Sequence, residues 1–216
     1  MAKKKEWRES EIVLAFNLSK VIDYTPLMQA WLSDTYPYFS ELDEYKFSNL
    51  QKAHFGYIEN WNEAEIRMRL VAPILDLGEV LSENGFVSFF SKRIFTDSLE
   101  FPLSQKADFV VGKGIEKGRF IEKSYFHFQQ YKHTKKPLKD SMAQLLALFL
   151  IAQTRNNDGK PLYGCEIKSS VWTFVIMENN SYCVSKGFDS RDKEDLLAII
   201  AILRKFRHIL ETVLLV

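Results

Sequence analysis

The stretch from Phe86 to Lys132 constrains the fold more than any other part of the chain. It holds three short segments, 86–95, 106–111 and 124–132, which are rich in Phe, Val and Tyr and are separated by turn residues. Such runs between turns are typical of β-strands. Three more follow at 162–167, 171–177 and 181–185, and Asn179-Asn180 predicts a hairpin turn between the last two. The sequence therefore predicts six strands.

Helical patterns precede these strands. Apolar side chains recur at helical spacing through the first 60 residues, where Thr25-Pro26 and Ser40 are typical helix starts. Asn62 and Glu65 then form a capping-box pattern before a helix that Gly78 can end. The first 60 residues are therefore predicted to be a helical N-terminal extension, and residues 61–216 the main domain.

Two further helices are predicted among and after the strands. One follows Pro137 and Asp140, and the other begins near Asp192 and continues to the C-terminus. Strands beside helices in one unit predict an α/β fold with a mixed sheet flanked by helices. The loop 112–118 is rich in glycine but lacks the spacing of a phosphate-binding loop, so we expect a hairpin connection there.

The composition fits one domain with a modest extension. The 216 residues are 46% hydrophobic and 14% aromatic, which is enough for a packed core. The formal net charge is +1, so no chain-wide charge indicates a nucleic-acid or membrane partner. Any electrostatic footprint must therefore be local.

The sequence also predicts a compartment. Cys165 and Cys183 are too few for a disulfide scaffold, which favours buried thiols in a reducing environment. The charged N-terminus is not followed by an apolar run of signal-peptide length. Arg204 and Lys205 interrupt the apolar segment 196–216, which therefore predicts an amphipathic helix and no membrane span. We expect a cytoplasmic protein without a membrane partner.

One predicted strand carries polar residues on a row that should face the core. Side chains alternate along a strand, so Phe126, Phe128, Gln130 and Lys132 share one face. A lysine on such a row is costly to desolvate unless an anion lies beside it. Asp108 in the preceding strand can supply that anion if the two strands pair as a hairpin. We therefore expect Asp108, Gln130 and Lys132 to meet in one cleft.

This order of an aspartate, a strand bearing Gln-x-Lys and a helix resembles the PD-(D/E)xK nuclease superfamily. The segment 63–75 is similar to the opening helix of the nuclease domain in type I restriction enzyme R subunits. There an acid, an arginine four residues later and an apolar run around a proline recur, as in Glu63, Arg67 and Pro73. The helix of Gln144 and the strands of Gly164 and Trp172 resemble later elements of that group. The resemblance covers residues 63–177, and it extends to uncharacterised bacterial proteins with a similar helical front end.

The resemblance implies a restriction-endonuclease-like fold and a metal-dependent endonuclease that acts on DNA, in restriction or phage defence. Mg²⁺ or Mn²⁺ would be the cofactor, held by Asp108 as anchor, by Gln130 at the usual Glu position and by Glu63 as auxiliary acid. Lys132 would stabilise charge or assist the attacking water. Gln144 would reach toward the site from the following helix.

Gln130 departs from the family pattern, because an amide oxygen can ligate Mg²⁺ but carries no negative charge. Two hypotheses follow: a nuclease with weakened metal binding, or a catalytically degenerate nuclease fold that serves as a nucleic-acid or protein interaction module. A partner protein or a homodimer would then supply specificity. A structural domain unrelated to nucleases is a third alternative.

Each candidate residue also has a structural explanation. Asp108 fits a strand end, and Glu63 fits a first-turn acid that pairs with Arg67 four residues on. Lys132 begins a basic run, which suits either a solvated loop or a path for a phosphate backbone. The four histidines lack metal-ligand spacing, and Trp172 is expected in the core.

Overall fold

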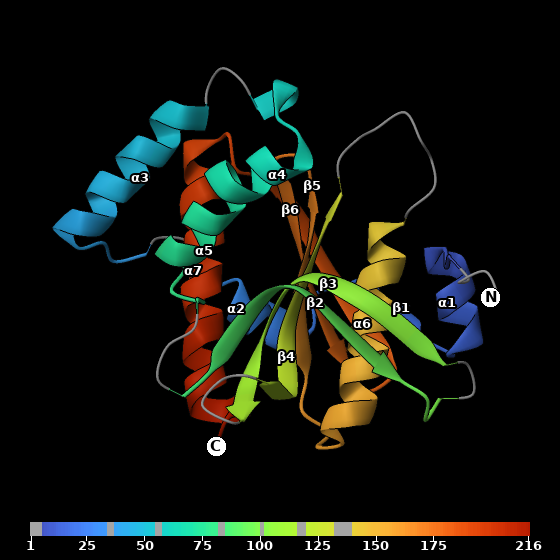
Figure 1. The fold of residues 1–216 in the computed structure, drawn as a ribbon. Helices are drawn as coiled ribbons and strands as arrows, with labels where there is room; N and C mark the ends of the chain where they lie inside the picture. The colour runs from blue at the N-terminus through green and yellow to red at the C-terminus, as the bar shows by residue number, and fades with distance from the viewer. Residues whose placement is uncertain are drawn as a thin grey trace.

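The computed structural model describes residues 6–33, 37–54, 58–81, 85–99, 102–115, 120–131 and 140–216. In these residues a seven-stranded sheet is flanked by helices (Figure 1). Its strand order is β1-β7-β6-β5-β4-β3-β2, so β1 and β2 are the edges. The β1–β7 and β4–β5 pairs are parallel and the other pairs are antiparallel. The predicted α/β fold with a mixed sheet is confirmed.

From residue 63 onward, two groups of three strands are separated and flanked by helices, in the predicted order. The strands are β1 (Ser19–Val21), β2 (Val87–Thr96), β3 (Leu103–Ile115), β4 (Phe120–Tyr131), β5 (Leu162–Lys168), β6 (Val171–Glu178) and β7 (Ser181–Asp189). The helices are α1 (Glu9–Ala15), α2 (Pro26–Trp31), α3 (Glu41–His54), α4 (Glu63–Ile66), α5 (Ala72–Leu77), α6 (Ser141–Asn156) and α7 (Lys193–Ile209). Short 3₁₀ and π segments complete them: η1 (Ile58–Asn60), η2 (Arg67–Val71) and η3 (Leu210–Leu214).

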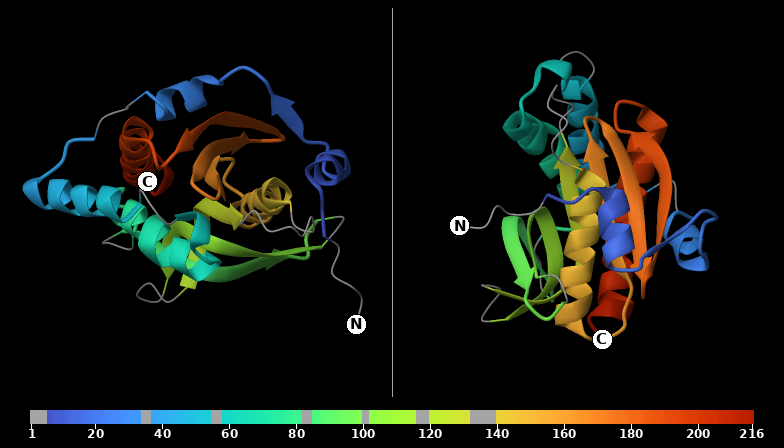
Figure 2. Two further views of the ribbon diagram at one scale, coloured as in Figure 1. Left: turned by 90° about the horizontal axis from the view of Figure 1, so that it is seen from above. Right: turned by 90° about the vertical axis from the view of Figure 1, so that its right-hand side faces the viewer.

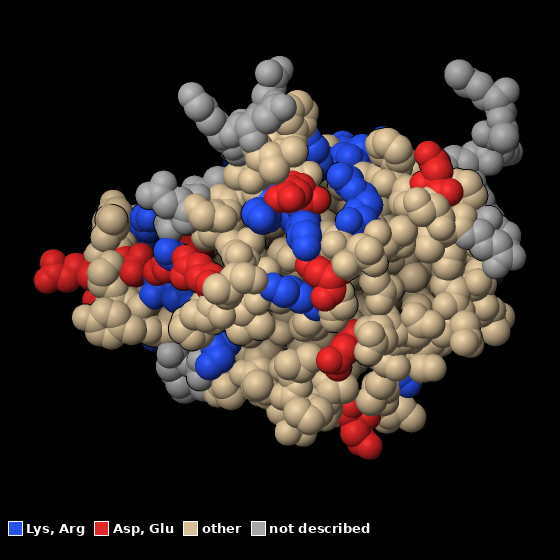
Figure 3. All heavy atoms as spheres, turned by 90° about the horizontal axis from the view of Figure 1, so that it is seen from below, with Lys and Arg blue, Asp and Glu red and all other residues tan. Residues whose placement is uncertain are grey.

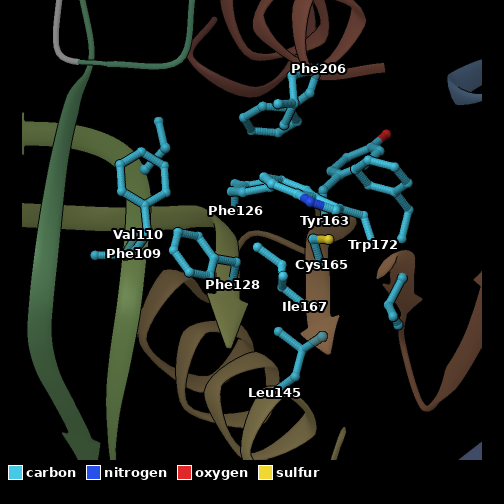
Figure 4. Close-up of a cluster of buried hydrophobic side chains, with 14 of the residues drawn as sticks. Phe109, Val110, Phe126, Phe128, Leu145, Tyr163, Cys165, Ile167, Trp172 and Phe206 are labelled. Atoms are coloured by element: carbon cyan, nitrogen blue, oxygen red, sulfur yellow. The ribbon is translucent and has the colours of Figure 1, made fainter. Parts of the chain in front are cut away.

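Two helices, α6 and α7, cover opposite faces of the sheet. Adjacent residues of β4 point to opposite faces. The His127 ring meets Phe149 of α6, whereas the Phe126 ring meets Phe206 of α7. In Figure 4, Phe206 lies on one side of the core cluster and Leu145 of α6 on the other, with side chains of β4 and β5 between them. The right panel of Figure 2 shows α1 beside α6, in line with their contacts.

The helix ends follow the predicted capping signals. The Thr25 side chain accepts a hydrogen bond from the N–H of Met28 at the start of α2. Asp140 and Asp192 cap α6 and α7 in the same way. Such bonds satisfy N–H groups that have no partner inside the helix. These boundaries were therefore predictable from a few neighbouring residues.

The N-terminal segment is not helical throughout. Residues 19–21 form β1, which pairs in parallel with residues 181–183 of β7, so the predicted helical stripe through Leu18, Val21 and Ile22 is wrong there. Leu18 and Val21 still pack on the core, whereas Ile22 is 93% exposed. An edge partner for β7 outweighs a weak helical preference, because it satisfies backbone groups along the open strand.

Trp31 joins α2 to the central core. Its indole N–H donates to the carbonyl of Ile202 in α7 at 2.9 Å. Its ring also makes edge contacts with Tyr163, Phe174 and Phe206. The α2 helix of the N-terminal segment therefore shares a core with the sheet.

β3 and β4 are longer than predicted, and β2 and β3 bend into an arch. In Figure 1, β2 and β3 arch across β4, with α4 on the upper side of the arch. The β3–β4 ladder has irregularities between Val111 and Gly112 and between Lys113 and Gly114. Such irregularities bend a strand and increase its twist. Gly112, predicted as loop, lies inside β3, where a Cβ atom would come within 1.9 Å of the Lys123 carbonyl oxygen.

The apolar C-terminal segment forms the predicted amphipathic helix. Its predicted inward residues are all buried, namely Leu196, Ile199, Ile200, Leu203, Phe206 and Leu210. Within the described part of the chain, no helix is both long and apolar enough to cross a membrane. Cys165 and Cys183 are free, buried thiols, as expected.

Candidate functional site

The predicted hairpin between the strands of Asp108 and Gln130 is confirmed. β3 and β4 pair antiparallel from Ile115 opposite Phe120 to Phe109 opposite Phe128. Asp108 stands one residue beyond this last pair, and Gln130 stands two residues beyond it. Both positions therefore lie just beyond the last residue pair of the two strands.

The offsets constrain how the two positions can meet. In an uninterrupted pleat, positions one and two residues beyond a facing pair lie on opposite sides of the sheet. The expected convergence therefore requires a departure from the regular pleat. Ser91 marks one, because it stands opposite Asp108 between two regular β2–β3 pairs and has a left-handed φ of 58°. A non-glycine residue in that region stores backbone strain, and strained residues cluster at functional sites.

A helix above the arch supplies the predicted acid. Asn62 and Glu65 form the expected capping box at the start of α4. The chain then passes through the π segment η2 into α5, where Pro73 lies in the first turn and Gly78 is the C-cap residue. Proline is tolerated in a first turn, so the predicted helix is kept despite Pro73. The π segment carries Arg67, and such segments occur frequently at functional sites.

Arg67 connects three elements at this point. Its Nη2 atom donates to Oε1 of Glu63 and to Oδ1 of Asp108, each at 3.1 Å, and its Nη1 donates to the Ser91 hydroxyl at 3.2 Å. The Arg67 and Asp108 side chains are only 22% and 15% exposed, whereas Glu63 is 62% exposed. The Arg67–Asp108 pair is therefore the shielded part of the network, and Glu63 closes it toward solvent.

The structure thus brings Glu63 and Asp108 to one positive charge. The structural alternative for Glu63, a pair with Arg67, is present together with the link to Asp108. The i,i+4 spacing predicted the first contact, but nothing in the sequence pointed from Arg67 to Asp108 or Ser91. Sequence reasoning missed Ser91, and it named Arg67 only as the partner of Glu63.

The remaining predicted site residues are placed less directly. Gln144 of α6 accepts a hydrogen bond from Gln105 at 3.3 Å, and Gln105 alternates with Asp108 along β3, so the two lie on different faces. Gln130 pairs through its backbone with Ile167 of β5. The side chain of Gln130 and the whole of Lys132 lie outside the described residues.

The donors at this site suit a hard cation. Mg²⁺ prefers carboxylate and carbonyl oxygens. The carboxylates of Glu63 and Asp108 converge on a single guanidinium nitrogen, so they already surround a positive charge. Binding a metal there would require Arg67 to give up a contact. Among the described residues, no group of three or more His, Cys, Asp and Glu side chains forms a ready metal site.

A second polar cluster lies at the same end of the sheet on the α6 face. Glu166 of β5 is 4% exposed, receives a hydrogen bond from the Ser141 hydroxyl at the start of α6, and lies 3.0 Å from the Lys168 ammonium. In the parallel ladder, Glu166 pairs with Gln129 of β4. Buried carboxylates need such partners. The cluster anchors the start of α6 beside the end of β4.

His127 is not a candidate for acid–base work. Its ring is fully buried, and its Nε2 atom lies 3.2 Å from the Ser124 hydroxyl. Burial lowers its pKa from 6.5 to about 3, so the ring stays neutral at physiological pH. His127 is therefore a residue of the core between β4 and α6.

A groove of about 840 Å³ lies on the other side of the helical segment that carries Arg67. It runs between α3 and the segment 61–81, and most of its lining is apolar, including Leu50, Trp61 and Met68. Its one carboxylate, Asp76, is paired with Lys46 at 2.7 Å. Of the predicted site residues that the structure describes, none lines it.

Comparison of the sequence with protein-family models and with curated proteins finds no match. Function can therefore be inferred only from the residues of the chain itself and their geometry. On the face drawn in Figure 3, positive and negative side chains are interspersed, in keeping with the near-zero net charge.

Proposed function

We propose that this chain is a nuclease-like domain whose site at Asp108 binds a divalent cation and acts on the phosphodiester backbone of DNA. The single observation that carries the proposal is the convergence of Glu63 and Asp108 on Arg67 at the end of the β3–β4 ladder. Two acids from distant elements meet there beside a strained strand residue. Such convergence in a partly shielded setting is a physical reason to expect function.

The order of elements supports the same proposal. The helix that carries Glu63 is followed by the strand of Asp108 and by the antiparallel strand of Gln130. Next come the helix of Gln144 and a strand that is parallel to the Gln130 strand. The segments that resemble the PD-(D/E)xK superfamily follow one another in this order. Fold alone does not determine function, so the proposal depends on the residues of the site.

In this proposal the residues have separate roles. Asp108 and Glu63 would hold Mg²⁺ or Mn²⁺, together with the amide oxygen of Gln130. When bound, the metal would polarise a phosphate and favour attack by water. Lys132 would offset the negative charge that develops on the phosphate, and Arg67 would release Asp108 while remaining close enough to contact the substrate.

A second function is favoured by two of the same observations. Arg67 already neutralises the two acids, and residue 130 is an amide where the superfamily has a carboxylate. Both features reduce the negative charge available to a metal. A catalytically degenerate domain that binds nucleic acid, or a partner protein, without cutting is the alternative.

Titration calorimetry with Mn²⁺ and a plasmid-nicking assay test the proposal. We expect Asp108→Asn to lose Mn²⁺ binding and Gln130→Glu to tighten it, because an added carboxylate attracts a hard cation. Lys132→Ala should abolish nicking while leaving Mn²⁺ affinity close to wild type. Asp76→Asn is a matched control, since it removes a carboxylate of α5 that pairs with Lys46.

The outcomes separate the two functions. Mn²⁺ binding without nicking in every variant, Gln130→Glu included, favours the degenerate module. Equal Mn²⁺ affinity in wild type and Asp108→Asn rejects a metal site at Asp108.

A further inference from the structure

Two cations face each other on the outer hairpin beside the candidate site. Arg93 of β2 lies directly opposite Lys106 of β3, and Lys106 is two residues before Asp108. Residues two apart on a strand share a face, at roughly 7 Å. Burial follows this alternation, because Lys106 is exposed and Asp108 partly so, while Ala107 and Phe109 are fully buried. Arg93 and Lys106 therefore lie on one solvent-facing surface, on the same face of the strand pair as the shielded Asp108.

Phe95 extends this surface away from Asp108. It pairs with Ser104 in the same ladder, and its side chain is 59% exposed. Its neighbours Ile94 and Thr96 are buried on the other face. The ring is thus presented to solvent by a ten-residue strand that is held in register by β3. Exposed aromatic rings on strands are platforms on which nucleic-acid bases stack.

The charges on this surface suit a phosphate. The Arg93 guanidinium donates to the Ser104 hydroxyl at 3.4 Å, a neutral partner that leaves its charge in place. A phosphate over Arg93 and Lys106 would gain a charge-assisted contact from each cation.

We propose that Arg93, Lys106 and Phe95, here called the β2–β3 track, guide single-stranded DNA to the site at Asp108. The inference rests on the proposed function and names its substrate. The cations would contact a phosphate next to the one at Asp108, and Phe95 would stack on a base further along the strand. A duplex keeps its bases stacked inside, so Phe95 favours a single strand or an unpaired end.

The track also explains how a chain of net charge +1 can attract a polyanion. Nucleic-acid affinity depends on local cations that displace counterions from phosphates. Because the overall field is weak, each cation on the track should change the salt dependence by a measurable amount.

Fluorescence anisotropy with labelled oligothymidylate, in EDTA to prevent cleavage, tests the track. The slope of log affinity against log salt should become shallower by about 0.7 for Arg93→Gln and by about 1.4 for Arg93→Gln with Lys106→Gln. Phe95→Leu should weaken binding by about 5- to 150-fold without changing the slope. A duplex should bind more weakly and respond little to Phe95→Leu.

Two variants serve as matched controls. Lys186→Gln removes an exposed strand lysine from β7, which is far from β2 in the strand order. Phe120→Leu removes a ring that is 42% exposed at the start of β4, outside the β2–β3 pair. Circular dichroism should be unchanged in all of these variants, because every substituted residue is exposed.

The inference and the proposed function fail in different ways. Wild-type slopes in the Arg93 and Lys106 variants, equal losses in Phe95→Leu and Phe120→Leu, or no DNA binding by the wild type would each overturn the track. None of these results bears on Mn²⁺ binding at Asp108. Conversely, loss of the metal site would leave the DNA-binding measurement in EDTA unaffected.

Discussion

Replacing Arg67 by glutamine should destabilise the protein and make the candidate site more receptive to metal. Removing one partner of a fully buried ion pair costs about 3–5 kcal/mol, whereas exposed pairs contribute about 0.2–1 kcal/mol. The Arg67 and Asp108 side chains are 22% and 15% exposed, which lies between these limits but nearer the buried one. We expect a loss of about 2 kcal/mol in the free energy of unfolding. For a domain of this size, that lowers Tm by about 4–8 °C.

Added Mn²⁺ should act in the opposite direction. A ligand that binds only the folded state stabilises it by about 2.7 kcal/mol at one hundred times its Kd. In the wild type, the cost of displacing Arg67 from the two acids offsets part of this stabilisation. In Arg67→Gln the acids are already available to the metal. Thermal unfolding with and without Mn²⁺ should therefore show a larger metal-induced rise in Tm for Arg67→Gln than for wild type.

Arg69→Gln is the matched control for this experiment. Arg69 lies on the same helix, is 59% exposed and stands 3.7 Å from Glu65. Its replacement should change stability by less than about 1 kcal/mol, with no change in the response to Mn²⁺. Equal Tm values for Arg67→Gln and wild type, or equal Mn²⁺ shifts in the two, would refute the reasoning.

Three further predictions concern the fold that holds the site. His127 is neutral when folded, because burial lowers its pKa from 6.5 to about 3, whereas the unfolded chain takes up a proton below pH 6.5. Between pH 6.5 and pH 4, protonation of His127 in the unfolded chain should therefore lower the free energy of unfolding by about 3 kcal/mol. Urea unfolding at several pH values should show a smaller decrease in His127→Leu. Trp31→Phe should cost about 1–3 kcal/mol in thermal unfolding, since the Ile202 carbonyl loses a buried donor, whereas Leu14→Ser, 82% exposed, should change little. Gly112→Ala should cost about 2 kcal/mol or more in the same assay, because its Cβ atom would meet the Lys123 backbone; unchanged stability would mean that the hairpin adapts.

Much of the architecture could be predicted from short stretches of sequence. Thr25, Asn62, Asp140 and Asp192 cap the helices that they were expected to start, because a cap bonds to an N–H only two or three residues away. Short runs rich in aromatic and β-branched residues between turns likewise predicted β5, β6 and β7. The expected interior position of Trp172 is confirmed.

The candidate site was predictable only in part. The positions of Asp108 and Gln130 near the end of one hairpin followed from the order of the strands. The link from Arg67 to Asp108 spans 41 residues, and its geometry depends on how the helix lies across the arch. No spacing rule reaches that far, so Arg67 was expected to pair with Glu63 alone.

The sequence by itself determined the type of most elements, their capped ends, the apolar rows that form the core and the hairpin that carries Asp108. These depend on contacts between residues that are close in the chain. Only the tertiary structure decided that residues 19–21 become a strand, that Gly112 lies inside β3 and that Arg67, Ser91 and Asp108 meet. Each of these features depends on a partner distant in sequence, whose pairing or packing outweighs a local preference of less than about 1 kcal/mol per residue.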